Sequence, residues 1–576
     1  MSVSHVVIAP LLVALSTAIL TLLTRTRGRL QRAVSLLGGV GYALAVAALV
    51  RATVLPLGSP SRTLVYQVSA WRPPFGIVLV ADALSAFVLV ISAVVGLAAL
   101  AYSVLYVGEY GQRLSYHPLF HFMWVGVTGA FLTGDVFNLF VWFEVMLMSS
   151  YVLVAFYGNA LQTRATLRYV VINLAGSAVM LLAIGGIYAT TGTLNMADIA
   201  RRLATPEQFG VDPVPVLGLS ALLFAVFAIK AGVVPFQFWV PDAYQAAPAP
   251  VTAVLAGVVK KVGIYAIVRL YFTVFAAASL PALGLPGFSG SGEATFLAFF
   301  GPIMFVMAAG SAIFGGLGAV SRTDLESLLA YSSIGQVGFI VLPLAIAATV
   351  PDLRVLGVAA ALVYSLNHGL AKGMLFLVAG TVKDAVGSTR FADLGGVGPR
   401  APTLSACFLL GGLSLIGVPP LLGFFGKLLV FRVVARAFAL GTASSLLAVG
   451  VALAGAILTI AYVSRAWNAV FWGPPGERVR VALPRRWIVP GEPATDGGEA
   501  DAESAPAGAS VTALRGQLLI VAALTLVILG VGVGFDPVYR FAEAAAHAAL
   551  DTQAYVHAVG PSTFDAAHTA ANGGGH

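Results

Sequence analysis

The chain has 576 residues, of which 59% are hydrophobic and only 10% are charged. A soluble globular protein carries about 25% charged residues, so this composition excludes a soluble fold and leaves the membrane class. The formal net charge of +8 sits mostly on Arg residues between apolar runs, which is typical of cytoplasmic loops and not of a nucleic-acid surface. Because Cys407 is the only cysteine, no intrachain disulfide or cysteine metal cluster can form.

The apolar runs predict about fourteen membrane-spanning helices, since one crossing needs roughly 20 apolar residues. The first run, Val6 to Leu23, has no charged segment before it and no small-residue cleavage site, so we interpret it as a spanning helix and not as a signal peptide. The expected spans are 5–24, 33–52, 76–107, 117–133, 135–157, 167–190, 215–243, 251–279, 295–320, 327–350, 354–381, 402–436, 445–473 and 514–535.

Two of these spans are predicted to be broken helices. The seventh contains Pro235 and Pro241, and the twelfth contains the run from Gly417 to Pro420. Proline removes an amide donor, and in lipid the freed carbonyls must be satisfied by protein or water. Matched breaks in two halves indicate an internal repeat, which we place at 117–279 and 295–473. Each half holds five spans, an odd number, so the two repeats must be inverted.

The expected architecture is therefore an all-α polytopic membrane protein. Residues 1–116 form three N-terminal spans, 474–513 form a partly disordered cytoplasmic loop, and 514–576 form the last span with an external tail. Arginines of the first loop and of the 473–513 loop mark the cytoplasmic side, so both termini are predicted outside, although Arg201 and Arg202 then fall on the external side. The tail residues His568 and His576 are interpreted as solvent-exposed and not as metal ligands.

The lysines are the most informative residues, because Arg cannot lose its proton in a protein whereas buried Lys can. Only six occur, and Lys383 is expected in a loop while the other five lie in or beside apolar spans: Lys230, Lys260, Lys261, Lys372 and Lys427. Ionisable residues at membrane depth are functional candidates. A chain with Arg at its surface and Lys in its spans is suited to changes of protonation.

Spacing suggests partners for these lysines. Glu144, in the fifth span, is expected to pair with Lys230, either as a functional pair or as a static one that fixes helix packing. Lys260 is expected to snorkel to the interface, because its neighbour Lys261 points about 100° away around the helix. His368 and Lys372 are one turn apart and can exchange a proton, and Ser365 is close enough to join them through water.

Four further ionisable residues lie near span ends. His117 and His121 repeat the four-residue spacing and are expected to have an interfacial role. Asp82 and Asp135 are expected to be solvated by interfacial water and are secondary candidates for a role.

Lys427 follows the second break, where half-helix ends suit water and ions.

Between residues 75 and 475 the chain resembles the antiporter-like membrane subunits shared by respiratory complex I, membrane-bound hydrogenases and Mrp cation/proton antiporters. Within that family it is most similar to the D-type Mrp subunit, for instance in Lys427, where the M-type complex I subunit typically has Glu. Two departures are Glu326-Ser327, where the family usually has a Lys or Arg pair, and Gln237, often His in complex I relatives. The resemblance rests on Asp82-Ala-Leu-Ser, Gly134 to Glu144, Lys230 to Ala253, Lys261-Val-Gly-Ile-Tyr, Leu329 to Gly338, Asn367 to Lys372 and Gly423 to Lys427.

This resemblance implies a proton-translocating subunit of a multisubunit Na⁺(cation)/H⁺ antiporter in the cell membrane of a prokaryote. It implies that Glu144 pairs with Lys230, and that Lys261, His368 and Lys372 continue a central polar axis that ends at Lys427. The implied partners are the A, B, C, E, F and G types of Mrp subunit, Na⁺, H⁺ and the lipid bilayer, with no cofactor and no enzymatic site. The alternatives are a proton-pumping subunit of a complex I-like or hydrogenase redox complex, and a scaffold that transports nothing.

Overall fold

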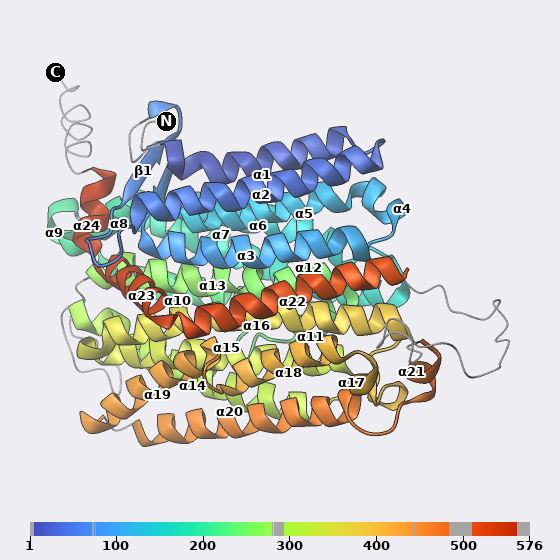
Figure 1. The fold of residues 1–576 in the computed structure, drawn as a ribbon. Helices are drawn as coiled ribbons and strands as arrows, with labels where there is room; N and C mark the ends of the chain where they lie inside the picture. Colours follow the sequence, from blue (N-terminus) through green and yellow to red (C-terminus); the bar gives the residue numbers. More distant parts are fainter. Residues whose placement is uncertain are drawn as a thin grey trace, which may run out of the picture.

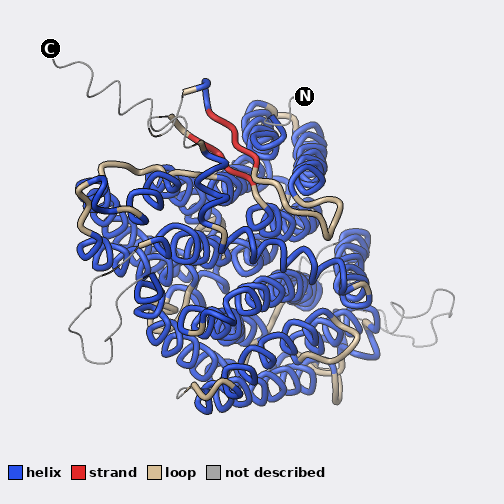
Figure 2. The backbone as a smooth tube through the Cα atoms, turned by 90° about the vertical axis from the view of Figure 1, so that its left-hand side faces the viewer, coloured by secondary structure: helices blue, strands red, loops and turns tan. Residues whose placement is uncertain are grey.

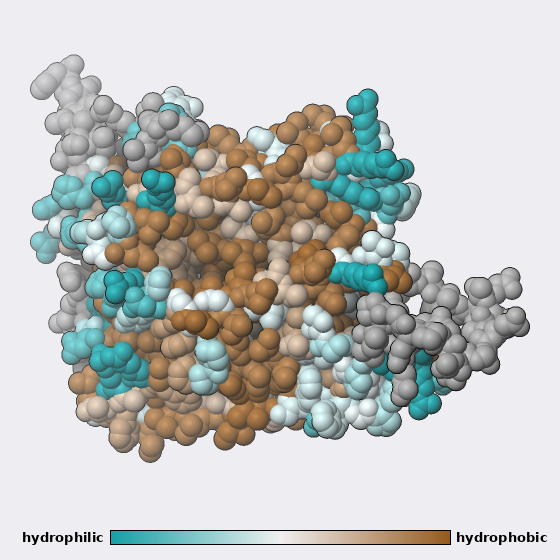
Figure 3. All heavy atoms as spheres, viewed as in Figure 1, coloured by the Kyte–Doolittle hydropathy of each residue, from teal (hydrophilic) through white to brown (hydrophobic). Residues whose placement is uncertain are grey.

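A computed structural model of the chain describes residues 5–71, 74, 76–278, 280, 293–442, 445–482 and 510–560. The expected linker 490–510 therefore lies almost entirely outside the described residues, as do His568 and His576. The described part is a bundle of long helices that run side by side, with their ends gathered at two opposite faces (Figure 1). A hydrophobic surface covers the middle of this bundle, and hydrophilic residues gather at its two ends (Figure 3).

Within the described residues, 12 helices are long and apolar enough to cross a membrane. Two further transmembrane-like segments run in the same bundle: the 16-residue helix α5 (His117–Leu132), and the pair α18 (Pro402–Ile416) and α19 (Leu422–Ala439), which a break separates. Together they match the polytopic helical architecture predicted from the sequence. An even number of passes also agrees with the start of α1 and with α24 (Thr552–Val559), which lie at the same end of the bundle (Figure 1).

The N-terminal part contains a short β-hairpin that the hydropathy pattern did not predict. Val78 to Ala81 begin the expected span 76–107, but they form a strand that pairs antiparallel with Leu64–Gln67. Figure 2 shows these strands over one end of the bundle. The elements of this part are α1 (His5–Leu23), α2 (Gly28–Thr53), β1 (Leu64–Gln67), η1 (Val68–Ala70), β2 (Val78–Ala81), α3 (Ala83–Tyr106), α4 (Glu109–Gly111) and η2 (Gln112–Tyr116).

The central part follows α5 and includes the first broken helix. One span, from Ala249 to Ala277, is continuous but irregular, because α-helical and π-helical turns alternate along it. The elements are α6 (Val136–Val154), α7 (Ala160–Thr191), α8 (Met196–Ala204), α9 (Pro206–Phe209), α10 (Pro213–Ala231), α11 (Trp239–Ala246), α12 (Ala249–Val254), η3 (Leu255–Val259), α13 (Lys260–Ile267), η4 (Val268–Val274) and η5 (Phe275–Ala277).

The C-terminal part contains the second broken helix and ends in two helices that pack on the bundle. Thr273 Oγ1 donates to Ala549 O at 2.6 Å, and Thr552 Oγ1 donates to Thr273 O at 2.6 Å. The elements besides α18 and α19 are α14 (Glu293–Val320), α15 (Leu325–Thr349), η6 (Pro351–Leu353), α16 (Arg354–Val386), η7 (Phe391–Asp393), α17 (Val397–Arg400), α20 (Ser445–Ala466), η8 (Trp467–Phe471), α21 (Glu477–Ala482), α22 (Val511–Val533), α23 (Phe535–Leu550) and α24 (Thr552–Val559).

Both predicted helix breaks are present. Helix α10 ends at Gly232, which has a φ of 63°, and α11 begins at Trp239. Helix α18 ends at Gly417, with a φ of 94°, before α19. Glycine adopts these positive φ angles without steric cost. At the first break Ile229 O accepts from Gly232 N at 3.0 Å and from the indole of Trp239 at 2.8 Å, so the backbone and a side chain together satisfy a carbonyl at the end of α10.

Matching cap structures support the inverted internal repeat. Asp135 caps α6, and the backbone beside it pairs with the segment after α7, through Val136 N to Leu194 O at 2.9 Å. Asp324 caps α15 in the same way, and Leu325 N donates to Thr389 O, after α16, at 2.9 Å. Helix α8, which follows the first pairing, lies at one end of the bundle, and α17, which follows the second, lies at the other (Figure 1). The two motifs thus repeat in opposite orientations.

Close contact between α10 and α13 depends on Gly263. A Cβ atom at this position would stand 2.7 Å from Phe227 O and 2.8 Å from Ala231 N, both backbone atoms of α10. We expect Gly263→Ala to lower the stability of the purified protein by about 1–3 kcal/mol, because the two helices would have to separate. The midpoint of thermal unfolding measures this effect.

Gly218 is the matched control, because a Cβ there meets no atom within 4 Å. Gly218→Ala should leave the midpoint unchanged or raise it slightly, since Ala is the better helix former. Equal midpoints for the two variants would contradict the close packing of α13 on α10.

Candidate functional site

Six ionisable side chains lie in the interior of the bundle, away from both of its ends. All of them are at most 5% exposed: Lys230, Lys260, Lys261, His368, Lys372 and Lys427. Lys383 is different, because its side chain is 40% exposed and pairs with Glu326 at 2.9 Å. It lies in the last turn of α16 and not in the loop that the sequence suggested. Burial therefore separates five lysines from the sixth.

Lys230 lies in the last turn of α10, beside the first helix break. Its Nζ donates to Asn173 O at 3.0 Å and to Ser177 Oγ at 3.2 Å, both on α7. The Ser177 hydroxyl in turn bonds to Glu144 Oε1 on α6. Glu144 and Lys230 are thus brought together as expected, but through Ser177, and the ion pairs among the described residues include none between the two.

Sequence reasoning missed Ser177. Glu144 is half-buried, on the side of α6 that also carries the exposed side chains of Phe137 and Met148. The spacing of Asn173 and Ser177, one helical turn apart on an otherwise apolar span, was the available signal. A serine in an apolar helix is common, so that signal alone does not single it out.

Lys260 corrects the snorkelling prediction. It is 0% exposed, and its Nζ has no hydrogen-bond partner among the described residues. This atom lies beside the first break, 3.4 Å from where a Cβ of Gly232 would stand. The prediction was wrong because the span from Ala249 to Ala277 is buried on all sides, so neither of the adjacent lysines has a route to the interface.

Lys261 and His368 join α13 to α16. Lys261 Nζ lies 2.5 Å from His368 Nδ1 and donates to Ala256 O, in the π-helical turn η3, at 2.6 Å. His368 Nε2 lies 3.1 Å from Ser333 Oγ on α15. If Lys261 is an ammonium, His368 Nδ1 must accept a hydrogen bond from it. A neutral His368 then carries its hydrogen on Nε2 and donates a hydrogen bond to Ser333.

Lys372 lies one turn further along α16 and faces the same helix, α15. Its Nζ donates to Leu329 O at 3.1 Å and to the hydroxyl of Ser332. His368 and Lys372 therefore share a face as predicted, but they bind adjacent serines and not each other. The Ser365 hydroxyl, expected to join them, has no hydrogen-bond partner in the described part of the chain.

Lys427 lies in the first turns of α19, just after the second break. Its Nζ stands 4.9 Å above the ring of Phe339, a cation–π distance, and has no hydrogen-bond partner within the described ranges. Polar groups that sequence reasoning missed lie on the neighbouring helices. Ser414 donates to Asn367 at 2.7 Å, and Gln336 donates to Thr459 at 3.0 Å and to Tyr462 while accepting from Tyr364.

Asp82 and Arg269 form a buried ion pair outside this axis. Asp82 is 1% exposed, and its Oδ2 lies 2.6 Å from the Arg269 guanidinium, so solvation by interfacial water was the wrong expectation. Burial also raises the pKa of Asp135, which caps α6 at the same end of the bundle. These two carboxyl groups have structural partners and do not contact the lysines.

The histidines at the start of α5 were also expected at the interface, but both are buried. Ser35 of α2 lies 3.0 Å from His117 Nδ1 and 2.9 Å from His121 Nε2. They form a separate polar cluster among the N-terminal helices.

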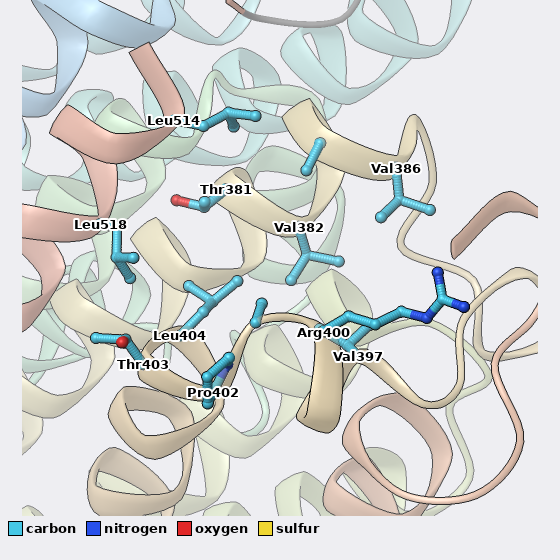
Figure 4. Close-up of a pocket in the computed structure, with 12 residues that line it drawn as sticks. Thr381, Val382, Val386, Val397, Arg400, Pro402, Thr403, Leu404, Leu514 and Leu518 are labelled. Atoms are coloured by element: carbon cyan, nitrogen blue, oxygen red, sulfur yellow. The ribbon is translucent and has the colours of Figure 1, made fainter. Parts of the chain in front are cut away.

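The cavity in Figure 4 lies apart from the lysines, between α16, α18 and α22. It has a volume of about 180 Å³ and a mostly apolar lining that includes Val382, Leu404 and Leu518, with Arg400 at one side. No group of three or more His, Cys, Asp or Glu residues in the described part of the chain could hold a metal ion. The buried lysines and their hydroxyl, imidazole and carbonyl acceptors are thus the chemically distinctive feature: a row of titratable side chains in the interior of the bundle.

Broken helices, an inverted repeat and a row of buried lysines define an antiporter-like membrane subunit. Residues 133–454 match the family described as "NADH:quinone oxidoreductase/Mrp antiporter, TM", and the chain belongs to this family.

The relatives fall in two branches of that family. The chain is 35% identical over 471 residues to the D-type subunit of the Na⁺/H⁺ antiporter of Alkalihalophilus pseudofirmus, covering 82% of this chain and 87% of the relative. It is 37% identical over 507 residues to the N-type subunit of the NADH-quinone oxidoreductase of Desulforudis audaxviator, covering 84% and 92%. The solved Mrp complex from Dietzia sp. DQ12-45-1b contains a chain with a TM-score of 0.80 and 28% identity, with 97% of this chain and 100% of that chain covered.

Buried lysines with and without hydrogen-bond acceptors among the described residues should respond differently to replacement by Met. We expect Lys260→Met to raise the free energy of unfolding by about 1–3 kcal/mol, because a buried amine without a protein acceptor is replaced by an apolar side chain of similar shape. Lys372→Met should gain less or lose stability, because it leaves Leu329 O and Ser332 without their donor. Thermal unfolding of the two purified variants makes the comparison. A lower midpoint for Lys260→Met than for Lys372→Met would contradict this prediction.

Proposed function

We propose that the chain is the proton-carrying, D-type subunit of a multisubunit Na⁺(cation)/H⁺ antiporter in the plasma membrane of a prokaryote. The observation that carries this proposal is the row of buried lysines, three of which are hydrogen-bonded to different neighbouring helices. Lys230 reaches α7, Lys261 reaches α16 and Lys372 reaches α15. The D-type antiporter relatives and the Mrp structure support it. The other Mrp subunits, of the A, B, C, E, F and G types, are the proposed partners.

The proposed path runs along the middle of the membrane. Protons pass from Lys230 past Lys260 to Lys261, then by His368 to Lys372, and finally to Lys427. Hydrogen bonds join the path from Lys261 through His368 to Ser333, and we expect water to bridge the remaining gaps. The two helix breaks lie beside Lys230 and Lys427, and broken helices inside a membrane are suited to water and ions.

Glu144 is the proposed coupling group. While its carboxylate is linked to Lys230, the ammonium is stabilised. When that negative charge moves away, the loss in a low-dielectric site is worth several kcal/mol and favours release of the proton. Such switching would couple proton movement along the axis to cation movement elsewhere in the assembly.

The alternative function is that of a proton-pumping subunit in a complex I-like or hydrogenase redox complex. The similarity to the N-type subunit of an NADH-quinone oxidoreductase supports this alternative. The same axis would serve, driven by electron transfer in partner subunits. Affinity purification of the chain with its native partners decides between the two, because antiporter subunits or redox subunits would be recovered with it.

Lys230 and Glu144 provide the central test. In everted vesicles that contain the assembled complex, Lys230→Ala and Glu144→Ala should abolish Na⁺- or K⁺-driven proton exchange. Lys230→Arg should fail as well, because Arg keeps the charge but cannot release a proton. Exchange is followed by the fluorescence of a pH-sensitive dye after cation addition.

Lys383→Ala is the matched control, since Lys383 lies at the end of α16 with a partly exposed side chain. It should exchange at nearly the wild-type rate. Exchange by Lys230→Ala or Lys230→Arg in a fully assembled complex would contradict a proton-carrying role for Lys230.

We also propose that both termini lie outside the cell. The loop between α1 and α2 carries Arg25 and Arg27, and Arg29 follows in the first turn of α2. This loop lies at the same end of the bundle as α21, which carries Arg478 and Arg480. This end is proposed as cytoplasmic, because cytoplasmic loops are rich in Arg and Lys. Helix α24 lies at the opposite end (Figure 1).

Single cysteines test this orientation in a Cys407→Ala background. A membrane-impermeant maleimide should label Gln553→Cys, on α24, in intact cells, and should label Arg478→Cys, on α21, only in everted vesicles. Both side chains are accessible in the structure. Labelling in the reverse pattern would place the termini in the cytoplasm.

A further inference from the structure

Two of the buried lysines are held by the same local arrangement. Lys230 donates to the backbone oxygen of Asn173 and to the hydroxyl of Ser177, which itself lies 3.0 Å from Asn173 O. Lys372 donates to Leu329 O and to the hydroxyl of Ser332, which lies 3.0 Å from that same carbonyl. In each case a lysine from one helix binds a carbonyl and a serine from a single turn of the next helix.

The serine differs from the carbonyl in what it can do when the lysine changes its charge. A carbonyl oxygen only accepts, so it binds an ammonium but not the lone pair of a neutral amine. A hydroxyl accepts from an ammonium and can rotate to donate to a neutral amine. Both groups can accept an N–H bond in either protonation state, but only the serine can also donate to the lone pair of the neutral amine.

Ser177 has a feature that Ser332 lacks. Its hydroxyl carries one hydrogen but lies within bonding distance of two acceptors, Asn173 O and Glu144 Oε1. With the hydrogen toward Glu144, the hydroxyl connects Lys230 to the carboxylate. With the hydrogen toward Asn173, this connection is broken. Rotation about a single bond thus makes or breaks the hydrogen-bonded link between Lys230 and Glu144.

The inverted repeat shows that this link belongs to one half only. Glu144 and Ser333 stand at the same distance after the matched caps Asp135 and Asp324. Ser177 and Lys372 likewise stand at the same distance before the bridge residues Asn195 and Arg390. In the second half, a serine bonded to His368 replaces the carboxylate. Among the buried lysines of the described chain, the hydroxyl and the acid meet only at Lys230.

We propose that Ser177 carries the proton between Lys230 and Glu144, a step that deepens and rests on the function proposed above. One N–H bond of the ammonium breaks as a new O–H bond forms on Ser177. The original Ser177 O–H bond breaks as an O–H bond forms on Glu144. Serine is unchanged, and the ammonium and carboxylate become a neutral amine and a neutral acid. Both products are cheaper to bury than separated charges.

The test compares substitutions at 177 in the assembled complex in everted vesicles. Ser177→Ala should lower the rate of cation-driven proton exchange by about tenfold or more, the scale of a lost proton-transfer group. Ser177→Thr, which keeps a hydroxyl, should remain near the wild-type rate. The pH at which exchange is half-maximal should move by about half a unit or more in Ser177→Ala and stay in place in Ser177→Thr. A purely structural role for Ser177 would change the yield of the complex but not this pH.

Ser150→Ala is the matched control, because Ser150 is a buried serine of α6 that bonds to Tyr169 and lies off the axis. It should exchange like the wild type. Should Ser177→Ala fail to assemble, Ser177→Val takes its place, because Val matches Thr in shape without the hydroxyl.

Wild-type rate and pH dependence in Ser177→Ala, or equal rates for the Thr and Val variants, would overturn the role of Ser177. If Lys230→Ala is inactive in the same assay, the proposed function stands without this step. Activity in both Lys230→Ala and Glu144→Ala would instead refute the proposed function itself.

Discussion

An ammonium group inside an apolar helix bundle is costly unless it finds acceptors, and this constraint shapes the surroundings of Lys230, Lys261 and Lys372. Regular helices offer few acceptors, because each carbonyl already accepts a bond within the helix, although its second lone pair can still take one from a lysine, as at Asn173 and Leu329. The buried lysines accordingly occur where helices are irregular or carry hydroxyls. Lys230 lies at the end of α10, Lys261 binds a carbonyl of the π-helical turn η3, and Lys427 follows the break before α19. The breaks that make the helices less stable on their own are the same features that make buried charge tolerable.

The inverted repeat supplies these irregularities twice, but the two halves have diverged in chemistry. Both keep the aspartate caps at Asp135 and Asp324 and the glycine that ends the broken helix. In the described chain, only the first half has a carboxylate linked to its buried lysine. The second half instead contributes the imidazole of His368, which contacts Lys261 of the first half, and the ring of Phe339, which lies under Lys427. Both groups can bind a cation without a full negative charge. The repeat therefore places similar irregularities in both halves, and the side chains around the lysines make the two halves chemically different.

Most of the architecture could be predicted from the sequence, because long apolar runs and proline–glycine breaks are strong local signals. The burial of Lys230, Lys372 and Lys427 followed from their apolar neighbours. The error on Lys260 had a physical cause: on a helix with one lipid-facing side only one of two adjacent lysines can be buried, but this span is enclosed on all sides. The hydrogen bonds of Ser177 and Gln336 join segments that are far apart in the sequence, so no local sequence pattern predicts them. The strand Val78–Ala81 was missed because its residues resemble the start of a span.

Glu144 lies on the outward side of the bundle, where it can contact neighbouring molecules. It is half-buried and shares the outward side of α6 with Phe137 and Met148, which are 42% and 60% exposed. A carboxylate on a lipid-facing surface is costly, so it is either neutral or covered by protein or water. A neighbouring protein over this side of α6 would separate the carboxyl group from lipid. Because Ser177 connects Glu144 to Lys230, a contact made there from outside this chain would reach Lys230 through one hydroxyl. Under the proposed function, this link is where the row of buried lysines would respond to events elsewhere in an assembly.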